Sequence, residues 1–128
     1  TILKFSEEEN PLLLSLACGR QFSGESLDEV AEKLFQNHPQ LQIILYTRGS
    51  IGSVILERNR PSLTVPAAKT EVVSTVGAGD SIGASWLCMY LWGHSLDHAA
   101  EIASRVSAFM VAHKEVIPKY RIQEFLIK

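Results

Sequence analysis

The chain has 128 residues, 46% of them hydrophobic and 20% charged, which is enough for one domain with a hydrophobic core. A net charge of −2 and the lack of any run of Lys and Arg argue against a nucleic-acid surface. The longest mostly apolar stretch, 82–92, is shorter than the about 20 residues that span a bilayer. Nothing resembles a signal peptide, and Cys18 and Cys88 suit reduced core thiols, so we expect a cytoplasmic protein with no membrane partner.

The first elements are a short strand over residues 2–5 and a helix that begins after it. Ser6 and Glu9 have the spacing of a capping box, in which a serine caps a helix and a glutamate three residues later bonds back to it. A capping role alone would account for the presence of Ser6 and Glu9, without any role in function. Gly19 is the expected end of the helix.

A second helix is predicted over residues 27–35, because its apolar side chains recur with helical spacing behind another box of Ser26 and Glu29. The unbroken apolar run 43–46 then has the pattern of a strand covered on both faces in a parallel sheet. A helix followed by a buried strand indicates an α/β layer.

Residues 47–52 follow this strand, and further short strands are expected at 54–56 and 63–65. Loops at the carboxyl ends of strands bind ligands in α/β proteins, and a threonine with two glycines could present backbone donors to a nucleotide. A hairpin turn would use the same residues. Spacing alone favours the turn.

The stretch 74–81 combines a glycine loop with the start of a helix. Gly77, Ala78 and Gly79 would let backbone N–H groups approach an anion closely at a helix N-terminus. Asp80 would repel that anion, which favours a role as proton acceptor during phosphoryl transfer. An aspartate in the first turn also stabilises a helix dipole, and spacing leaves both interpretations open.

The remaining elements are expected to be helical. The helix over about 79–91 should pack through its large apolar residues, Trp86, Leu87, Tyr90 and Leu91. Ser95 opens a helix with an alanine-rich stripe through residue 110, and residues 120–128 suit a last short helix.

Two other kinds of site fit the sequence poorly. His94 and His98 have the spacing of a metal pair, but the helix begins between them, and a third ligand would have to be Asp97 or a remote residue. A P-loop requires lysine after its last glycine, whereas Gly79 is followed by aspartate.

Three motifs together resemble a known family. Residues 74–81 resemble the Asp-Thr-x-Gly-Ala-Gly-Asp-Ser signature of the PfkB, or ribokinase-like, carbohydrate kinases. Residues 4–9 resemble the segment with that family's Asn-x-x-Glu motif, in the form with serine first that bacterial fructokinases often have. Residues 47–52 resemble its Thr-x-Gly-x-x-Gly nucleotide loop, and the motifs follow in the family's order.

The resemblance implies a ribokinase-like α/β/α sandwich with a largely parallel sheet flanked by helices, and a reaction that uses ATP and Mg²⁺. Asp80 would be the catalytic base, with the anion hole formed by Gly77, Ala78 and Gly79. Glu9 would hold hydrated Mg²⁺, with Ser6 as the first residue of its motif. The nucleotide would lie on Thr47, Gly49, Gly52 and Ser104.

The departures from the family bear on activity. Ser74, which precedes Thr75, stands where the family usually has aspartate, and Ser104 stands where an asparagine often lies near the adenine. The sugar-binding half and its lid have no counterpart here, so we interpret residues 1–128 as a single incomplete domain, the nucleotide-binding half of a fructokinase-like enzyme.

On this interpretation the isolated chain is inactive, and its sugar substrate binds through the missing half. The sequence leaves open whether the full-length protein forms a homo-oligomer. The alternative is a non-catalytic nucleotide-binding or assembly module that keeps the fold without the turnover.

Overall fold

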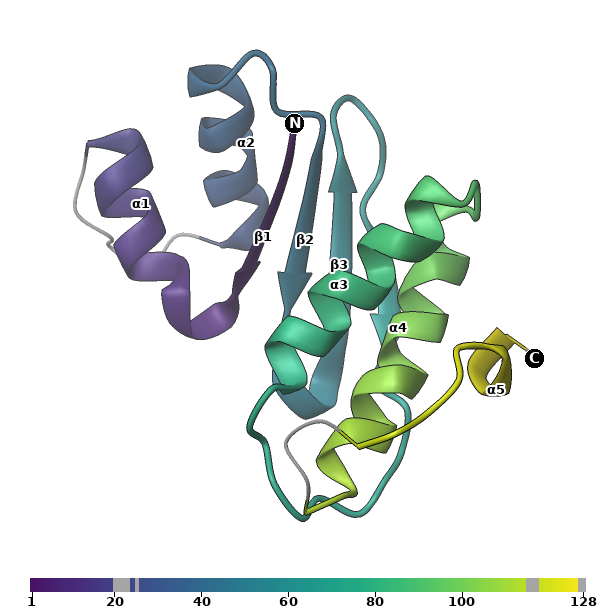
Figure 1. The fold of residues 1–128 in the computed structure, drawn as a ribbon. Coiled ribbons are helices and arrows are strands. Elements are labelled where there is room, and N and C mark those ends of the chain that lie inside the picture. The colour runs from purple at the N-terminus through teal and green to yellow at the C-terminus, as the bar shows by residue number, and fades with distance from the viewer. Residues whose placement is uncertain (20–23, 25, 115–117, 127–128) are drawn as a thin grey trace. The chain divides into compact units, whose positions relative to one another are not determined.

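The computed structural model describes residues 1–19, 24, 26–114 and 118–126. Its strands are β1 (Ile2–Ser6), β2 (Ile43–Thr47), β3 (Gly52–Glu57) and β4 (Leu63–Pro66) (Figure 1). Its α-helices are α1 (Asn10–Cys18), α2 (Leu27–Asn37), α3 (Ala78–Leu91), α4 (Leu96–Val111) and α5 (Gln123–Leu126), with 3-10 turns η1 (Glu7–Glu9) and η2 (Gly49–Ile51). The chain divides into two compact units, residues 1–48 with 54–63 and residues 49–53 with 64–128.

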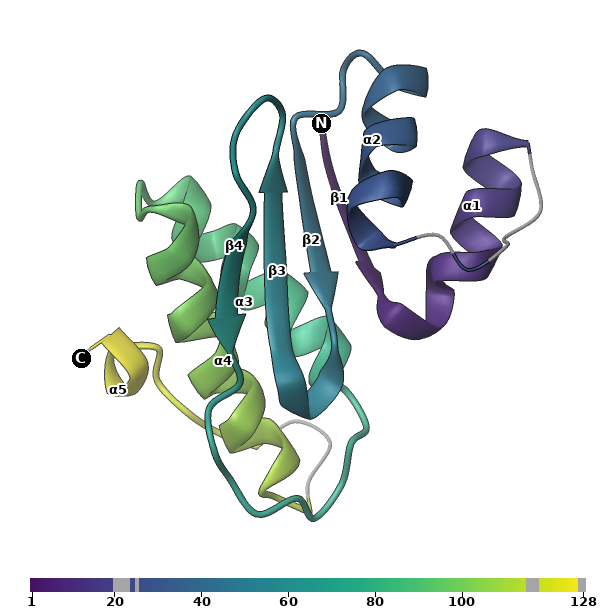
Figure 2. The same ribbon diagram turned by 180° about the vertical axis from the view of Figure 1, so that it is seen from behind.

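The strands are hydrogen-bonded in the order β1-β2-β3-β4. β1 and β2 run parallel, with Ile2 opposite Ile43 and Ser6 opposite Thr47. β3 runs opposite to β2, and β4 opposite to β3 (Figure 2). The α/β class is confirmed, but the sheet is mixed rather than largely parallel. Residues 48–51 are too few for the crossover that a parallel pair requires, so β2 and β3 form a hairpin.

The first unit packs α2 against its strands, and α1 packs against α2 (Figure 2). The start of α2 agrees with the predicted capping box, because the Ser26 hydroxyl accepts from the Glu29 N–H at 3.3 Å and the Glu29 carboxylate accepts from the Ser26 N–H at 2.8 Å. The buried residues of this core are Phe5, Val30, Ala31, Leu34, Leu41, Ile44, Tyr46, Val54 and Leu56. Their burial fixes β1 and β2 in register, so both strands end at the same edge.

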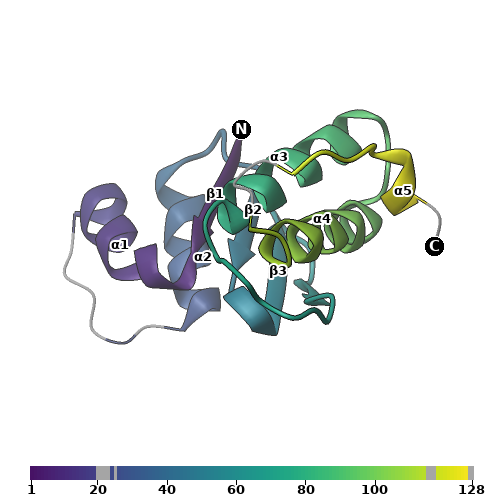
Figure 3. The same ribbon diagram turned by 60° about the horizontal axis from the view of Figure 1, so that its bottom comes forward.

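The second unit is built on α3 and α4, which lie side by side (Figure 3). The Trp86 indole N–H donates to the Leu96 carbonyl at 3.3 Å, and the small residues Ala99 and Ala103 are fully buried on α4. α5 contacts α4, where the Arg105 guanidinium donates to the Phe125 carbonyl at 3.3 Å. The predicted last helix is therefore present over Gln123–Leu126, and residues 127–128 lie outside the described residues.

The packing of α3 differs from the expectation. Trp86 is buried as predicted, but Leu87 is 41% exposed and Leu91 is 71% exposed, while Met89 is fully buried. Cys88 is exposed, so it is not a core thiol, and the Cys18 side chain lies outside what the structure describes. Within the described ranges, every helix is too short or too polar to reach across a lipid bilayer.

Candidate nucleotide and phosphate site

The predicted capping box at the end of β1 is present. One carboxylate oxygen of Glu9, Oε2, accepts from the Ser6 N–H at 2.7 Å and from the Ser6 hydroxyl at 3.0 Å. These two bonds lower the pKa of Glu9, so the group stays ionised well below neutral pH. The second oxygen, Oε1, has no hydrogen-bond partner among the described residues. Glu9 therefore offers one fixed and one available acceptor oxygen.

The turn after β2 contains the predicted nucleotide loop. Thr47 is buried at the end of β2, and Gly49 begins a 3-10 turn with a φ of +53°. Gly52 has a φ of +126°, and a Cβ built on it would lie 2.2 Å from the Val65 carbonyl oxygen. The close approach of β3 to β4 thus explains Gly52 without a ligand, whereas a Cβ at Gly49 would have no atom within 4 Å.

The start of α3 presents free donors. Gly77 precedes the helix with a φ of +80°, and the Ala78 N–H donates to the Thr75 carbonyl at 3.2 Å. Neither the Gly79 nor the Asp80 N–H has an acceptor among the described residues, and both residues are exposed. An anion at this helix end would therefore meet the Gly79 and Asp80 donors, while the Ala78 donor is already bonded.

The loop before α3 is anchored to α4. The Val111 carbonyl accepts from the N–H groups of Val73 and Ser74, at 2.7 and 3.0 Å. The Ser74 hydroxyl accepts from the Val76 N–H at 3.3 Å, which is the local turn bond that an aspartate side chain would also form. The start of α3 is held as well, because the Ala78 carbonyl accepts from the hydroxyls of Ser81 at 2.9 Å and Ser107 at 3.3 Å. These bonds fix the free donors in place before any ligand arrives.

Asp80 differs from a capping aspartate. Among the described residues no hydrogen bond or ion pair involves its carboxylate, and Asp80 is exposed in the first turn. Asp97 occupies the first turn of α4, where hydrogen bonds from the Ser95 hydroxyl and the His98 N–H lower its pKa. Of these two first-turn aspartates, Asp80 alone therefore leaves its carboxylate available for a reacting group.

Ser104 has a structural contact that sequence reasoning missed. It is buried on α4, and its hydroxyl accepts from the Ala68 N–H at 2.7 Å. This bond holds the segment after β4 against α4. No local pattern could reveal it, since the two residues are 36 positions apart. Its role toward a nucleotide stays a prediction.

Direct metal coordination has little support in the described part of the chain, which contains no group of three His, Cys, Asp or Glu residues placed to hold an ion. The His94 and His98 rings stack with their centroids 5.1 Å apart, and His98 lies 4.0 Å from a Glu101 oxygen. Mg²⁺ held through water at Glu9 stays a prediction.

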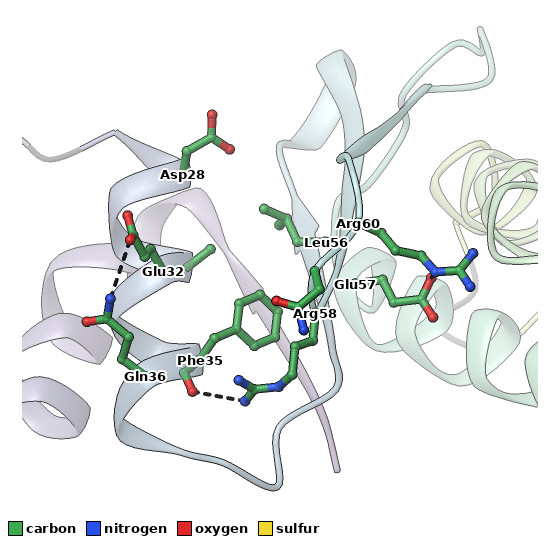
Figure 4. A pocket seen from close by; sticks show the side chains of 10 residues that line it. Asp28, Glu32, Phe35, Gln36, Leu56, Glu57, Arg58 and Arg60 are labelled. Atoms are coloured by element: carbon green, nitrogen blue, oxygen red, sulfur yellow. Dashed lines mark hydrogen bonds and ion pairs between the residues drawn. The ribbon is translucent and has the colours of Figure 1, made fainter.

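A shallow pocket of about 360 Å³ lies in the first unit between α2 and the end of β3 (Figure 4). Arg58 forms its wall, stacks over the Phe35 ring, and donates to the carbonyls of Phe35, His38 and Leu41 at 2.8 to 2.9 Å. Its Nε and Nη2 donors are thus committed to the fold. None of the three sequence motifs lines this pocket.

Comparison with known proteins places the chain in a family. Residues 1–122 match the pfkB family of carbohydrate kinases. The bifunctional protein HldE of Caulobacter vibrioides is 38% identical over 74 residues, which are 58% of this chain and 15% of that protein. A nucleoside kinase of Methanocaldococcus jannaschii is 32% identical over 76 residues, 59% of this chain and 25% of that enzyme.

Solved structures agree on the fold. An Escherichia coli protein assigned to ribokinase II, in complex with ATP and Mg²⁺, superposes with a TM-score of 0.79 at 22% identity. The superposition covers 97% of this chain and 37% of that protein, so the chain spans well under half the length of these relatives. The ribokinase-like fold is confirmed, and the chain belongs to the pfkB family of carbohydrate kinases.

Proposed function

We propose that the chain carries the nucleotide and phosphoryl-transfer residues of an ATP-dependent, fructokinase-like carbohydrate kinase. The observation that carries this proposal is the start of α3, where two N–H groups and a carboxylate have no partner within the part of the chain that the structure describes. Donors alone would suit any anion. An added carboxylate suits a reaction in which an anion is held and a proton is removed.

In the proposed step, the oxygen of a sugar hydroxyl attacks the γ-phosphorus of ATP. A P–O bond forms to the sugar, the bond to the bridging oxygen breaks, and ADP leaves with that electron pair. The hydroxyl proton passes to the carboxylate of Asp80. The N–H groups of Gly79 and Asp80 donate to the phosphoryl oxygens, on which negative charge is concentrated during transfer.

The residues of the other motifs are assigned to the nucleotide and the metal. Thr47, Gly49, Gly52 and Ser104 are proposed to contact the nucleotide, as the family's loop does. Glu9 fits a water-mediated Mg²⁺ contact, because its ionised carboxylate has one oxygen held by Ser6 and the other available. When bound, Mg²⁺ would neutralise charge on the phosphates.

The sugar is proposed to bind outside this chain, since the relatives are much longer and none of the residues described here forms a sugar-binding signature. Ribokinase-fold relatives include a nucleoside kinase, so the acceptor hydroxyl could belong to a free sugar or to the ribose of a nucleoside. The competing proposal is a module that binds nucleotide without transferring phosphate.

Asp80→Asn tests the proposal, with Asp97→Asn as the matched control in the first turn of α4. In a complete kinase that contains this chain, Asp80→Asn should lower kcat by about 10²- to 10⁴-fold, the usual contribution of a positioned base. ATP affinity should stay the same or improve, because a negative charge beside the phosphates is removed.

Asp97→Asn should leave both quantities unchanged. If Asp80 only stabilised its helix dipole, the two variants would behave alike, with near-normal kcat and a small loss of stability. Retention of more than about a third of kcat by Asp80→Asn would overturn the base assignment, because even the low end of that range is a hundredfold effect. Nucleotide binding with no transfer to any sugar or nucleoside would support the module.

A further inference from the structure

The exits of β1 and β2 carry an ion pair that belongs to none of the assigned roles. Ser6 and Thr47 lie opposite each other where the two parallel strands end, so the next residues, Glu7 and Arg48, leave the sheet side by side. Their charged groups are 3.6 Å apart, between Arg48 Nη2 and Glu7 Oε1. Ligands of α/β proteins bind at this edge, beyond the carboxyl ends of the strands.

Stability does not account for this pair. The side chain of Arg48 is 38% exposed and that of Glu7 is 55% exposed, and exposed ion pairs contribute little to folding. Its position in the sequence is more informative. Glu7 lies in the proposed metal-binding motif, and Arg48 separates Thr47 from Gly49 in the proposed nucleotide loop. The pair therefore joins two motifs that are distant in the sequence.

The glutamates around the pair indicate that it affects the binding of a polyphosphate. Residues 7–9 are consecutive glutamates at the exit of β1, an unfavourable setting for a polyphosphate. Glu9 is held by Ser6, and Glu7 is held and neutralised by Arg48. One uncompensated carboxylate roughly 8 Å from Mg·ATP, which carries about two net negative charges, costs about 1 kcal/mol in water and weakens binding about sixfold.

We propose that Arg48 is a positioning residue for Mg·ATP, which acts by neutralising Glu7 beside Glu9, the carboxylate proposed to hold the hydrated metal. This inference rests on the proposed function. It predicts that Glu7 without its partner repels the nucleotide and lowers the affinity for Mg·ATP. Removal of both charged side chains should return the affinity to that of the wild type.

A double-mutant cycle on the 128-residue chain tests the proposal. The dissociation constant of Mg·ATP is measured at low salt for the wild type, Arg48→Ala, Glu7→Gln and the double variant. Arg48→Ala should weaken binding about sixfold, and Glu7→Gln, which leaves Arg48 uncompensated, should tighten it by a similar factor. The double variant should stay within about twofold of the wild type. Arg48→Lys should retain most of the affinity, because it keeps the charge.

Two controls separate charge from damage to the fold. Arg60→Ala removes a pair of the same length, 3.6 Å to Glu57, and should not change Mg·ATP binding. Adenosine, which has no phosphate charge, should bind Arg48→Ala as well as it binds the wild type, whereas a distorted loop would weaken both ligands.

The outcomes are distinct. If the double variant binds as weakly as Arg48→Ala, Arg48 contacts the nucleotide directly and the proposal is overturned. It is also overturned if Arg48→Ala binds normally. A wild-type chain that does not bind Mg·ATP at millimolar concentration removes the proposed function, and this inference with it.

Discussion

Gly52→Ala should be severely destabilising, although the position lies in a proposed ligand loop. A Cβ at this residue would meet the Val65 carbonyl oxygen at 2.2 Å and the Ala67 nitrogen at 2.9 Å. Both obstacles are backbone atoms of β4 and the residues after it, so no side-chain rotation can relieve the overlap. The φ of +126° adds conformational strain for any residue with a Cβ.

The expected magnitude follows from these two effects. Overpacking typically costs about 1–3 kcal/mol, and a strained backbone conformation costs about 1–3 kcal/mol more. The sum of about 2–6 kcal/mol is a large part of the about 5–15 kcal/mol that stabilises a domain. Gly49→Ala is the matched control, because its φ of +53° is left-handed but its Cβ would meet no atom within 4 Å. We expect it to cost about 1–2 kcal/mol.

Urea unfolding followed by circular dichroism measures both variants. Gly52→Ala should unfold at much lower urea than Gly49→Ala, or fail to fold. If the free energies of unfolding of the two variants differ by less than about 1 kcal/mol, β3 and β4 do not approach as closely as described, since overpacking alone predicts a larger difference. The result also shows whether the second glycine of the loop is required by the fold before any nucleotide binds.

Three further predictions concern hydrogen bonds. Ser104→Ala should destabilise the chain by about 1–3 kcal/mol, because the part-buried Ala68 N–H loses its acceptor. Urea unfolding measures this loss. An unchanged Mg·ATP dissociation constant in the same variant would assign Ser104 to the fold alone. Ser26→Ala should cost about 1 kcal/mol through loss of the α2 cap, and an unchanged melting temperature would contradict the cap. Glu9→Ala should lower the melting temperature at pH 7, and because the folded pKa of Glu9 is depressed, the difference should narrow as the pH falls below the unfolded value of 4.5. A difference that is constant down to pH 3 would contradict the Ser6–Glu9 bonds.

The sequence was most informative where local patterns decide the structure. The box of Ser26 and Glu29 with its apolar period predicted α2, and the run 43–46 predicted the buried strand β2. The hairpin between β2 and β3 was also readable, since a four-residue connection excludes a parallel crossover. The resemblance implied a largely parallel sheet, whereas the structure has a mixed one, because the short connections that follow β2 and β3 allow hairpins but no parallel crossover.

Long-range contacts could not be predicted from the sequence. α3 is apolar on every side, so its composition could not distinguish buried Met89 from exposed Leu87 and Leu91. The partner of Ser104 and the meeting of Glu7 with Arg48 depend on residues brought together by folding. At the start of α3 the motif indicated an anion site. Only the hydrogen bonds show that the Ala78 donor is engaged, while those of Gly79 and Asp80 have no acceptor among the residues described.

The most direct test of the central claim is a titration of the isotope-labelled chain with Mg·ATP, followed through its backbone amide resonances. We expect the Gly79 and Asp80 amides to shift together with those of Gly49 and Gly52. The dissociation constant should lie in the millimolar to high-micromolar range, because a partial site lacks ordering and contacts. If the Gly79 and Asp80 amides stay unchanged while the chain is saturated, or if no binding occurs at millimolar nucleotide, the start of α3 is not a phosphate site.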